Sequence, residues 1–376
     1  MKQLQLVHEG ALYRNPYPGH QAVCAFQPNV VALSDDHLLC LYRVGQAFYS
    51  LDGKLAAVRS TDGGRTWSEP VLAWDPRNDQ GAGYTYGAPH GSRIKDGSLL
   101  MVAHRTQRRE EDFLSFNPDT GGSRPSESVL LRSADEGRTW SRPEVLELPD
   151  EPVIDTPSSI IELNDGRWFL AGEIWKAWND PAPLHVKGFA VFSPDQGRTW
   201  TDRVDFPSAA RTDRMYSHSR YTRMRDGRVA ALQWCQEVGG DVNHDLHLVI
   251  SDTSGRKWSD PQPTAIKAQT CWLGDLGGGT LVMTYSVREG RKPGVMVASS
   301  YDEGRTWDMD HQVMVWDAVG QEFLGVQAKP SYPASHENIA FGKPNTAVLP
   351  CGDVISSWWC TQASVTHIRY ARLTLA

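Results

Sequence analysis

Histidine, arginine, carboxylate and aromatic residues gather at two kinds of position in this sequence, the beginnings of some strand-like segments and the connections after others. Aromatic and hydrogen-bonding groups suit sugar rings, arginine and lysine suit an acidic substituent, and paired carboxylates can act as acid and base. The residues at the beginnings are His20, Gln27, Tyr84, Tyr86, His90, Asp155, Arg214, His218, Trp272, His336, Lys343 and Asn345. Those in the connections are Arg43, Gln46, Arg105, Glu173, Trp175, Glu237, Asp241, His244 and Arg288. Together they predict a carbohydrate site, provided that the fold brings them to one face.

A repeated stretch of sequence indicates how the chain is organised. The pattern Ser-x-Asp-x-Gly-x-Thr-Trp occurs five times, and its fourth copy is degenerate because Thr253 and Lys257 replace the usual Asp and Thr. The copies begin at Ser60, Ser133, Ser193, Ser251 and Ser300. Asp and Ser side chains bond nearby backbone N–H groups, Gly permits a positive φ, and Trp provides a large apolar surface. This chemistry is that of a structural turn.

Short β-like segments surround each copy of the repeat. A run such as "KLAAVR" precedes the turn, and another run, usually opened by an Asp-Gly or Gly-Gly turn, precedes that one. A third run lies before each pair, which makes six units of about four strands. We therefore predict an all-β, six-bladed β-propeller of four-stranded antiparallel blades. Residues 1–376 form a single domain in this prediction, and the N-terminal "LQLVHEGALYR" supplies the outer strand of the last blade.

Composition narrows the classes of partner. The 376 residues carry a net charge of −7 with no block of Lys or Arg, so we expect no nucleic-acid partner. No apolar run is long enough to span a membrane, and the first residues lack the apolar stretch of a signal peptide. We therefore expect no membrane association and a cytoplasmic location. The six scattered cysteines are expected to be free thiols, and the oligomeric state is left open.

The five boxes in a six-unit pattern resemble the Asp-box, or BNR repeat, of the sialidase (neuraminidase) superfamily. The resemblance covers nearly the whole chain and implies the propeller fold. It also implies that the boxes join the third and fourth strands of a blade, on the side opposite the active site. The superfamily includes sialidases, other exo-glycosidases, polysaccharide lyases and non-catalytic members, so it does not by itself define the activity.

The resemblance implies catalytic groups that can be sought position by position. It implies an Asp acid/base after the second strand of the first blade, and Asp52 falls within two residues of that place. The alternative is that Asp52 and Gly53 form only a hairpin turn. Three arginines are implied on a substrate carboxylate. Phe26 stands in the place of the first, whereas Arg288 or Arg291 fits the third.

The other implied groups are replaced. Ser217 and His218 stand where a glutamate is implied, and Gln233 lies near the place of the second arginine. Lys343 and Asn345 stand where a tyrosine nucleophile is implied. Three residues lie close enough to substitute for the missing groups of the fourth blade: Arg214, Arg220 and Glu237. We therefore expect little or no hydrolysis of simple aryl sialosides.

These considerations predict a carbohydrate-active enzyme, an exo-acting glycoside hydrolase for a terminal sugar, neutral or anionic, that needs no cofactor and no metal. The predicted catalytic residues are Asp52, His218 and Glu237. The predicted substrate-binding residues are His20, Gln27, Arg43, Tyr86, His90, Arg214, Arg220, Trp272, Arg288, Arg291, Lys343 and Asn345.

Two rival functions stay open: a polysaccharide or oligosaccharide lyase using Tyr, His and Arg, and a non-catalytic glycan-binding propeller. Paired carboxylates at the floor of a pocket favour a hydrolase, whereas a Tyr/His pair without two carboxylates favours a lyase. A weaker alternative is a metal ion held by four histidines: His20, His90, His218 and His336. The long, charged segment 104–128 is expected on the same face as a binding loop or lid, or as a solvated insertion.

Overall fold

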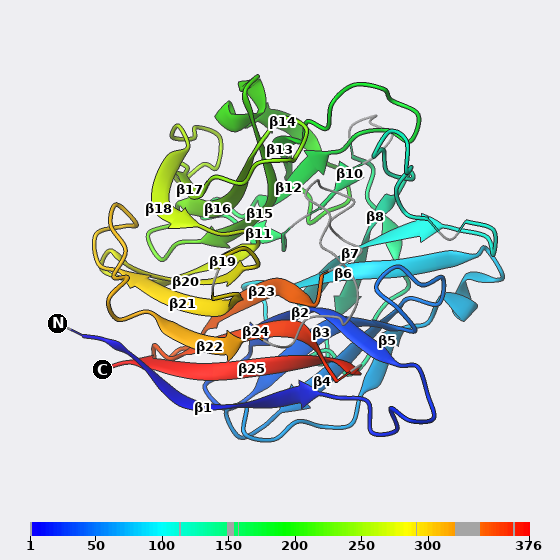
Figure 1. Ribbon diagram of the computed structural model, residues 1–376, viewed down its shortest axis with the longest axis horizontal. Coiled ribbons are helices and arrows are strands. Elements are labelled where there is room, and N and C mark those ends of the chain that lie inside the picture. Colours follow the sequence, from blue (N-terminus) through cyan, green and yellow to red (C-terminus); the bar gives the residue numbers. More distant parts are fainter. Residues whose placement is uncertain are drawn as a thin grey trace.

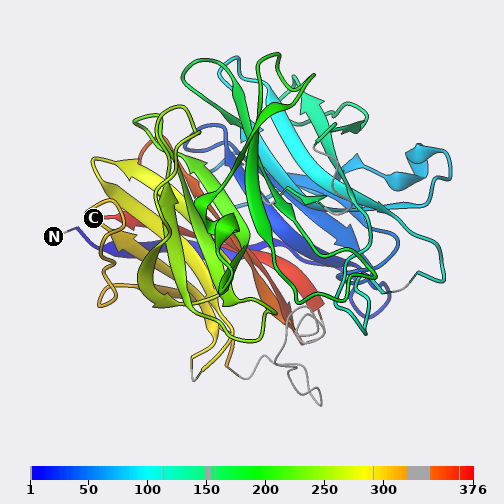
Figure 2. The ribbon, with the colours of Figure 1, turned by 90° about the horizontal axis from the view of Figure 1, so that it is seen from above.

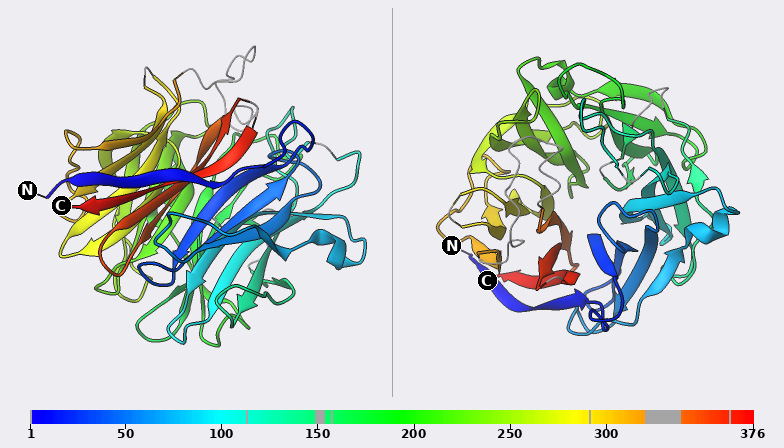
Figure 3. Two further views of the ribbon diagram at one scale, coloured as in Figure 1. Left: turned by 90° about the horizontal axis from the view of Figure 1, so that it is seen from below. Right: turned by 45° about the vertical axis from the view of Figure 1, so that its right-hand side comes forward.

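Six four-stranded units surround a central axis in the computed structural model, and this arrangement confirms the predicted six-bladed β-propeller (Figures 1 and 3). Blade 3 carries a fifth, two-residue strand. The structure describes residues 2–112, 114–148, 154–156, 158–290, 292–319, 339–363 and 365–376.

Each blade runs from an innermost to an outermost strand in chain order. The innermost strands of blades 1 to 6 are β2 (Cys24–Ala32), β6 (Tyr84–Arg93), β10 (Ile154–Asp155) with β11 (Ile161–Glu162), β15 (Arg214–Arg223), β19 (Cys271–Gly277) and β23 (Phe341–Val348). The second strands are β3 (Leu38–Gly45), β7 (Leu99–Gln107), β12 (Trp168–Ile174), β16 (Val229–Glu237), β20 (Thr280–Val287) and β24 (Val354–Gln362).

The outer strands are shorter on average and more exposed. The third strands are β4 (Lys54–Ser60), β8 (Glu127–Ser133), β13 (Lys187–Ser193), β17 (Asp245–Ile250), β21 (Gly294–Ser300) and β25 (Val365–Leu375). The fourth strands are β5 (Val71–Trp74), β9 (Glu144–Val145), β14 (Thr201–Asp205), β18 (Gln262–Lys267), β22 (Val313–Asp317) and, in blade 6, β1 (Leu4–Tyr13). Two short 3-10 helices, η1 (Pro76–Asp79) and η2 (Pro207–Ala210), follow β5 and β14.

The ends of the described chain meet in blade 6. Strand β1 pairs antiparallel with β25, from Leu4 opposite Leu375 to Tyr13 opposite Ile368 (Figure 3). This pairing joins the first described segment to the last one and closes the ring of blades, so β25 has no free edge.

The hydrophobic core is divided among the contacts between neighbouring blades. Both faces of each sheet pack on a neighbour, and six apolar clusters fill the spaces between blades. Tyr42 and Trp359, for example, join blades 1 and 6, whereas Leu39 and Leu131 join blades 1 and 2. A blade alone would expose both faces, so its burial depends on two neighbours.

The repeated boxes connect the third and fourth strands of blades 1 to 5, as expected. In the first box, Gly64 N–H donates to Ser60 Oγ at 2.8 Å, and Thr66 N–H donates to Asp62 Oδ1 at 2.9 Å. Trp67 Nε1–H closes the turn on Gly64 O at 3.0 Å. In the degenerate fourth box, Asp252 Oδ1 accepts the N–H groups of nearby residues instead. The boxes are therefore structural turns.

Each box also contacts the preceding blade. Gly304 lies so close to Leu248 of blade 4 that a Cβ would fall 2.4 Å from Leu248 Cδ2, and Trp307 packs in the cluster between blades 4 and 5. Arginines of the preceding blade reinforce the same contact. Their bonds to the next box are Arg59 to Gly137 O, Arg132 to Gln196 O, Arg167 to Ser254 O, Arg228 to Glu303 Oε1 and Arg372 to Gly63 O. The box end of the propeller is thus bonded from blade to blade.

Two further expectations concern the chain as a whole. All six cysteines are free, as expected, although Cys351 is exposed rather than buried. Within the described ranges, no helix combines the length and the apolar character that crossing a bilayer requires.

Trp307→Ala should lower the free energy of unfolding by about 3–5 kcal/mol, because it empties a large apolar site between two blades. Met309→Ala is the matched control, since Met309 is exposed, and it should change stability by less than about 0.5 kcal/mol. Urea unfolding measures both. Similar effects of the two substitutions would show that the box Trp is not a structural wedge.

The boxes should also make stability depend on acid. The hydroxyl and N–H of Thr66 hold the pKa of Asp62 at about 2, below its usual 3.8. A folded pKa below the unfolded one gives stability that is complete above about pH 4 and is lost as pH falls towards 2. Asp62→Asn should therefore differ from wild type by a constant amount above pH 4 and by less below it. Unfolding followed from pH 2 to 7 tests this, and a pH-independent difference would contradict it.

Candidate active site

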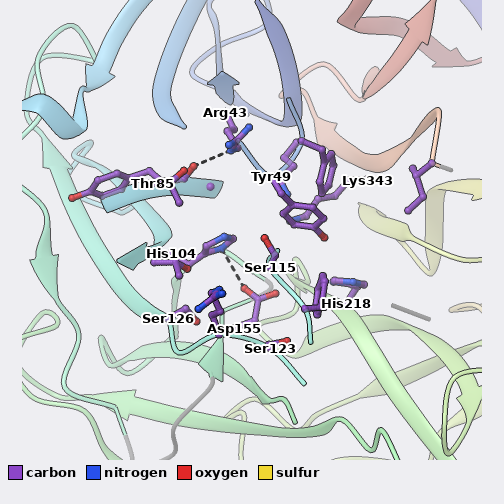
Figure 4. Close-up of a pocket in the computed structure, with 18 of the residues that line it drawn as sticks. Arg43, Tyr49, Thr85, His104, Ser115, Ser123, Ser126, Asp155, His218 and Lys343 are labelled. Carbon is purple, nitrogen blue, oxygen red and sulfur yellow. Dashed lines mark hydrogen bonds and ion pairs between the residues drawn. The ribbon is translucent and has the colours of Figure 1, made fainter. Parts of the chain in front are cut away.

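A pocket of about 180 Å³ lies at the end of the propeller where the first strands begin and the second strands end (Figure 4). This end is opposite the boxes, because the boxes follow the ends of the third strands, which run antiparallel to the second strands; Figure 2 shows the propeller from a second direction. The fifteen charged or aromatic residues of its lining are Arg43, Phe48, Tyr49, Tyr86, His104, Arg108, Phe116, Arg124, Asp155, Trp175, His218, Trp234, Arg288, Lys343 and Trp359. The predicted convergence of strand beginnings and connections on one site is therefore present.

Irregularities near the beginning of four innermost strands shape the pocket. Gln27, Ala88, His218 and Lys343 have left-handed φ angles of 57°, 45°, 48° and 48°, and each lies where the strand register shifts. An extra residue at a β-bulge re-aims its side chain, and such backbone is costly for a residue with a Cβ. Three of the four side chains line the pocket. The strain is therefore concentrated at the proposed site.

Amide side chains next to these bulges brace neighbouring blades. Gln27 Oε1 accepts the N–H of Ala88 at 2.6 Å, and Asn345 Oδ1 accepts the N–H of Val30 at 2.8 Å. Asn345 is buried and lies outside the pocket lining. The structure thus gives the predicted substrate-binding residue Asn345 a structural contact, and Gln27 reaches the lining while its amide oxygen holds blade 2.

Two carboxylates face each other at the floor. Asp155 of β10 pairs directly with Glu173 of β12. Glu173 is fully buried, and its two oxygens accept the N–H groups of Ser219 at 2.8 Å and His218 at 3.0 Å. Burial and the nearby Asp155 charge raise the pKa of Glu173 to about 7. Asp155 is therefore the member of the pair that reaches the pocket, whereas Glu173 holds the bulge of blade 4.

Histidines flank this pair from both sides. His104 Nδ1 lies 3.7 Å from Asp155 Oδ1, beyond hydrogen-bonding distance (Figure 4). Burial lowers the pKa of His104 to about 4, although the Asp155 charge opposes this, so its ring is neutral at pH 7. His90 is buried below, and neither ring nitrogen has a hydrogen-bond partner in the described part of the chain. Burial, with Arg220 and Lys343 next in importance, keeps the pKa of His90 well below 6.5.

Buried cations balance the carboxylates. Arg220 is only 1% exposed, lies 5.7 Å from the centre of the Trp272 ring, and interacts electrostatically with Asp155 and Glu173. Lys343 faces the same two carboxylates. The predicted substrate-binding residues Arg220 and Trp272 therefore lie beneath the pocket, where they support charges instead of lining it.

The possibility of a metal can be tested on the same groups. Asp155, Glu173 and His218 each offer a ligand atom, and these atoms lie within 4.8 Å of one another. This spacing could accommodate a divalent cation, but Arg220 and Lys343 already oppose the two negative charges. The four-histidine alternative is not supported by the described histidines, because His218 lines the pocket whereas His20 and His90 do not, and His336 lies outside the described residues.

The connection between β3 and β4 places Tyr49 in the pocket and is firmly held. Arg43 donates to Ala47 O at 2.7 Å and Ser50 O at 2.9 Å, Arg108 donates to Tyr49 O at 2.6 Å, and Thr85 Oγ1 donates to Ser50 O at 3.0 Å. The predicted substrate contact Arg43 thus acts mainly as a brace. Burial raises the pKa of Tyr49 above its usual range, so its phenol stays protonated and can donate a hydrogen bond.

The long connection between β7 and β8 forms one wall and is docked on blade 3. Ser123 N–H donates to Lys176 O at 2.8 Å, Asn117 Nδ2–H donates to Trp178 O at 2.9 Å, and Arg124 lies 4.2 Å from the centre of the Trp178 ring. Phe116 and Arg124 line the pocket. The expectation that segment 104–128 lies on this face is confirmed, and these contacts describe a fixed wall.

Arg288 of blade 5 reaches the pocket by passing over Gly342. It donates to Phe341 O at 3.2 Å and Thr270 Oγ1 at 3.4 Å. A Cβ on Gly342 would lie 2.2 Å from an Arg288 terminal nitrogen, so only glycine permits this path. Arg288 therefore lines the pocket as predicted, whereas Arg291 lies outside the described residues.

Two predicted catalytic carboxylates are not supported by their placement. Asp52 Oδ1 accepts the N–H of Gln46 at 3.1 Å within the β3–β4 connection, and Asp52 is not among the lining residues. Glu237 is half exposed and lies 3.5 Å from His244 and 4.0 Å from Arg214, beside a separate surface groove on blade 4. Among the lining residues, Asp155 is the carboxylate that reaches the pocket.

The remaining predicted residues divide between the two regions. Tyr86 lines the pocket, and its hydroxyl donates to Asp79 at 2.8 Å. Arg214 lines the blade 4 groove, and exposed His20 lies in the β1–β2 connection. Asp155 and Glu173 were predicted on this face without a role, and Tyr49 was not predicted there. The signal for Tyr49 was the adjacent aromatic pair Phe48–Tyr49 in a connection that follows a buried strand.

This combination of a six-bladed propeller, box turns at one end and a polar pocket at the other defines a BNR-repeat propeller of the sialidase superfamily. Residues 112–338 match the BNR repeat-like domain family, and the chain belongs to it. A curated sialidase from Bacteroides fragilis (strain YCH46) is 21% identical over 288 residues, covering 68% of this chain and 48% of the relative. The chain thus spans about half the length of that relative.

Solved structures share the fold at low identity. A protein of unknown function from Dyadobacter fermentans DSM 18053 is similar over 100% of both chains, with a TM-score of 0.75 and 16% identity. The Hadza microbial sialidase Hz136 is similar over 97% of this chain and 68% of its own, with a TM-score of 0.67 and 18% identity. These likenesses confirm the architecture.

The buried Glu173 should make stability fall as pH rises. Its folded pKa of about 7 exceeds the ordinary 4.5, so the folded state retains a proton that the unfolded state has released. The stability is complete below about pH 4.5 and declines up to pH 7, by a few kcal/mol at most, at about 1.4 kcal/mol per unit of pKa difference. Glu173→Gln should remove this decline. Urea unfolding from pH 4 to 8 measures it, and identical slopes for both proteins would contradict the assignment.

Proposed function

We propose that this protein is an exo-acting glycoside hydrolase that removes a terminal acidic sugar. The observation that carries the proposal is the carboxylate pair at the floor of a walled pocket, with Asp155 exposed to the pocket and Glu173 behind it. The superfamily includes hydrolases, and the curated relative is a sialidase.

Asp155 is proposed as the acid/base residue. It has neutral His104 on one side, and the buried Glu173 and cationic Arg220 behind it. Glu173 has a pKa of about 7, so the Asp155–Glu173 pair can hold one proton between its two members at neutral pH. In this proposal Glu173 positions the site without touching the sugar, because both of its oxygens bond backbone N–H groups and its side chain is buried.

The walls of the pocket support an exo-acting enzyme with an acidic substrate. Phe48 and Phe116 line the pocket from two different connections, and walls of this kind suit one end of a sugar chain better than its middle. Arg288 and Lys343 line the pocket and can attract a carboxylate or sulfate. A preference for sialic acid is not part of the proposal, since Phe26, packed on Phe48 and Trp359, occupies the place of the first family arginine.

A lyase is the second candidate, and a specific observation favours it. Tyr49, His104 and Lys343 line the pocket together with Arg288, which provides groups for proton transfer beside a cation that can neutralise a uronate. The ultraviolet absorbance of an unsaturated uronate product distinguishes it from a hydrolase.

Asp155→Asn should lower kcat by a factor of about 100 to 10,000 on the best substrate from a panel of aryl uronides, aryl sialosides and neutral aryl glycosides. Asp52→Asn is the matched comparison on the same face, and it should stay within about threefold of wild type. The reverse pattern would return the catalytic role to Asp52. Tight glycan binding with no turnover of any substrate would leave a binding protein, and strong sialoside turnover would contradict the proposed selectivity.

A further inference from the structure

The amino group of Lys343 is unusual among the cations of the pocket. Lys343 is a bulge residue with a φ of 48°, lines the pocket, and donates its backbone N–H to Thr270 Oγ1 at 3.2 Å. Among the described residues, its side-chain nitrogen has no hydrogen bond or ion pair. Lys343 is half-buried, and a lysine drawn partly out of water is normally paired, because desolvating an isolated ammonium is costly. The neutral amine avoids that cost.

The charged groups around Lys343 have opposing effects on the pKa of its amine. Arg220 lies below it, and Arg288 shares the Thr270 hydroxyl with its backbone N–H. Asp155 and Glu173 supply the opposing negative charges. Burial, followed by the Arg220 charge, lowers the pKa of Lys343 to about 7 against the pull of these carboxylates.

The histidines near Lys343 carry no charge that would act on its amine. His90 and His104 of blade 2 are both neutral at pH 7, because burial lowers the pKa of each. The neighbouring charge with the largest effect on the pKa of Lys343 is that of Arg220. A far larger fraction of Lys343 side chains is therefore neutral at pH 7 than for an ordinary lysine, of which roughly one in a few thousand is neutral.

A neutral amine in a pocket, beside a cation and within reach of a carboxyl group, is the arrangement that makes lysine a nucleophile toward carbonyl carbon. We infer that the pocket captures a 2-oxo acid as an imine on Lys343. This activity is independent of the proposed glycosidase, since it requires neither a glycosidic bond nor a paired acid and base for hydrolysis.

The reaction needs no additional reagent. The Lys343 nitrogen adds to the keto carbon, so a C–N bond forms while the C=O π bond opens and its oxygen gains a proton from the amine. The nitrogen lone pair then forms C=N as the C–O bond breaks, and the oxygen leaves as water with the second amine proton. Asp155 is placed to carry these protons between nitrogen and oxygen, because it lines the same pocket and interacts with Lys343.

The charges around the amine favour an acidic carbonyl compound over a neutral one. When Lys343 is neutral, Arg220 opposes the charges of Asp155 and of Glu173, which is itself partly protonated at pH 7. Arg43 and Arg288 add positive charge at the pocket lining. The local field is therefore positive, and a carboxylate next to the carbonyl group is attracted into the pocket.

The test uses the intact wild-type protein, with glyoxylate as the 2-oxo acid and cyanoborohydride to reduce any imine to a stable carboxymethyl amine. Peptide mapping by mass spectrometry should find Lys343 modified at least tenfold faster than Lys95 at pH 7. Lys95 is the internal control, since its side chain is 55% exposed and paired with Glu162. The rate at Lys343 should rise from pH 6 to 8 and then level off, whereas that at Lys95 should keep rising.

Two further arms complete the experiment. Glycolaldehyde, a neutral carbonyl compound of similar size, should modify Lys343 more slowly than glyoxylate, and equal rates would overturn the assignment of a 2-oxo acid. Lys343→Arg should remove the fast modification, while Lys95→Arg should retain it. Modification that merely follows exposure, with Lys95 ahead of Lys343, would overturn the inference. That result would leave the glycosidase untouched, because the trapping reaction is read without any sugar substrate.

Discussion

The structure depends on the mutual burial of neighbouring blades. A single four-stranded blade has two apolar faces, and each face is covered only when the next blade is present. The ring must therefore close for any blade to be stable, and β1 beside β25 closes it. Polar bonds then fix the spacing of the blades, through box turns and arginines at one end and side-chain amides at the other.

The two ends of the propeller use this arrangement differently. At the box end, the polar side chains are satisfied by backbone groups nearby, as Asp62 is by Thr66. At the pocket end, four bulges hold residues in left-handed backbone, and buried charged groups lie within one small volume. Such groups lower stability unless the surrounding fold holds them. The box end can therefore stabilise the strained backbone of the pocket end, because the same strands run through both ends.

The fold could be predicted because its signals are local and repeated. Every box contains its own turn residues, and a turn marks every strand pair. The same structural prediction therefore follows independently from each repeat. The site could be predicted only as a face. Asp52 and Asp155 are equally visible in the sequence, but Asp52 bonds its own connection, whereas Asp155 comes to lie opposite Glu173. That difference depends on register across a short two-residue strand, and no nearby residue specifies it.

Other parts of the site could not be predicted from the sequence for related reasons. The role of Arg43 follows from its bonds to the carbonyl groups of the β3–β4 connection, which no spacing in the sequence reveals. The wall formed by the β7–β8 connection depends on contacts with Trp178 and Lys176 from another blade. In each case the missing information is a long-range contact that fixes a connection.

The pairing of β1 with β25 also bears on how the protein is made. During synthesis, β1 emerges before the other strands of the propeller but has no partner in its sheet until β25 follows. Blade 6, which carries Lys343 and Trp359, cannot complete its sheet until β25 has emerged between β24 and β1. The pocket therefore cannot be complete before β25 has been synthesised and the ring has closed.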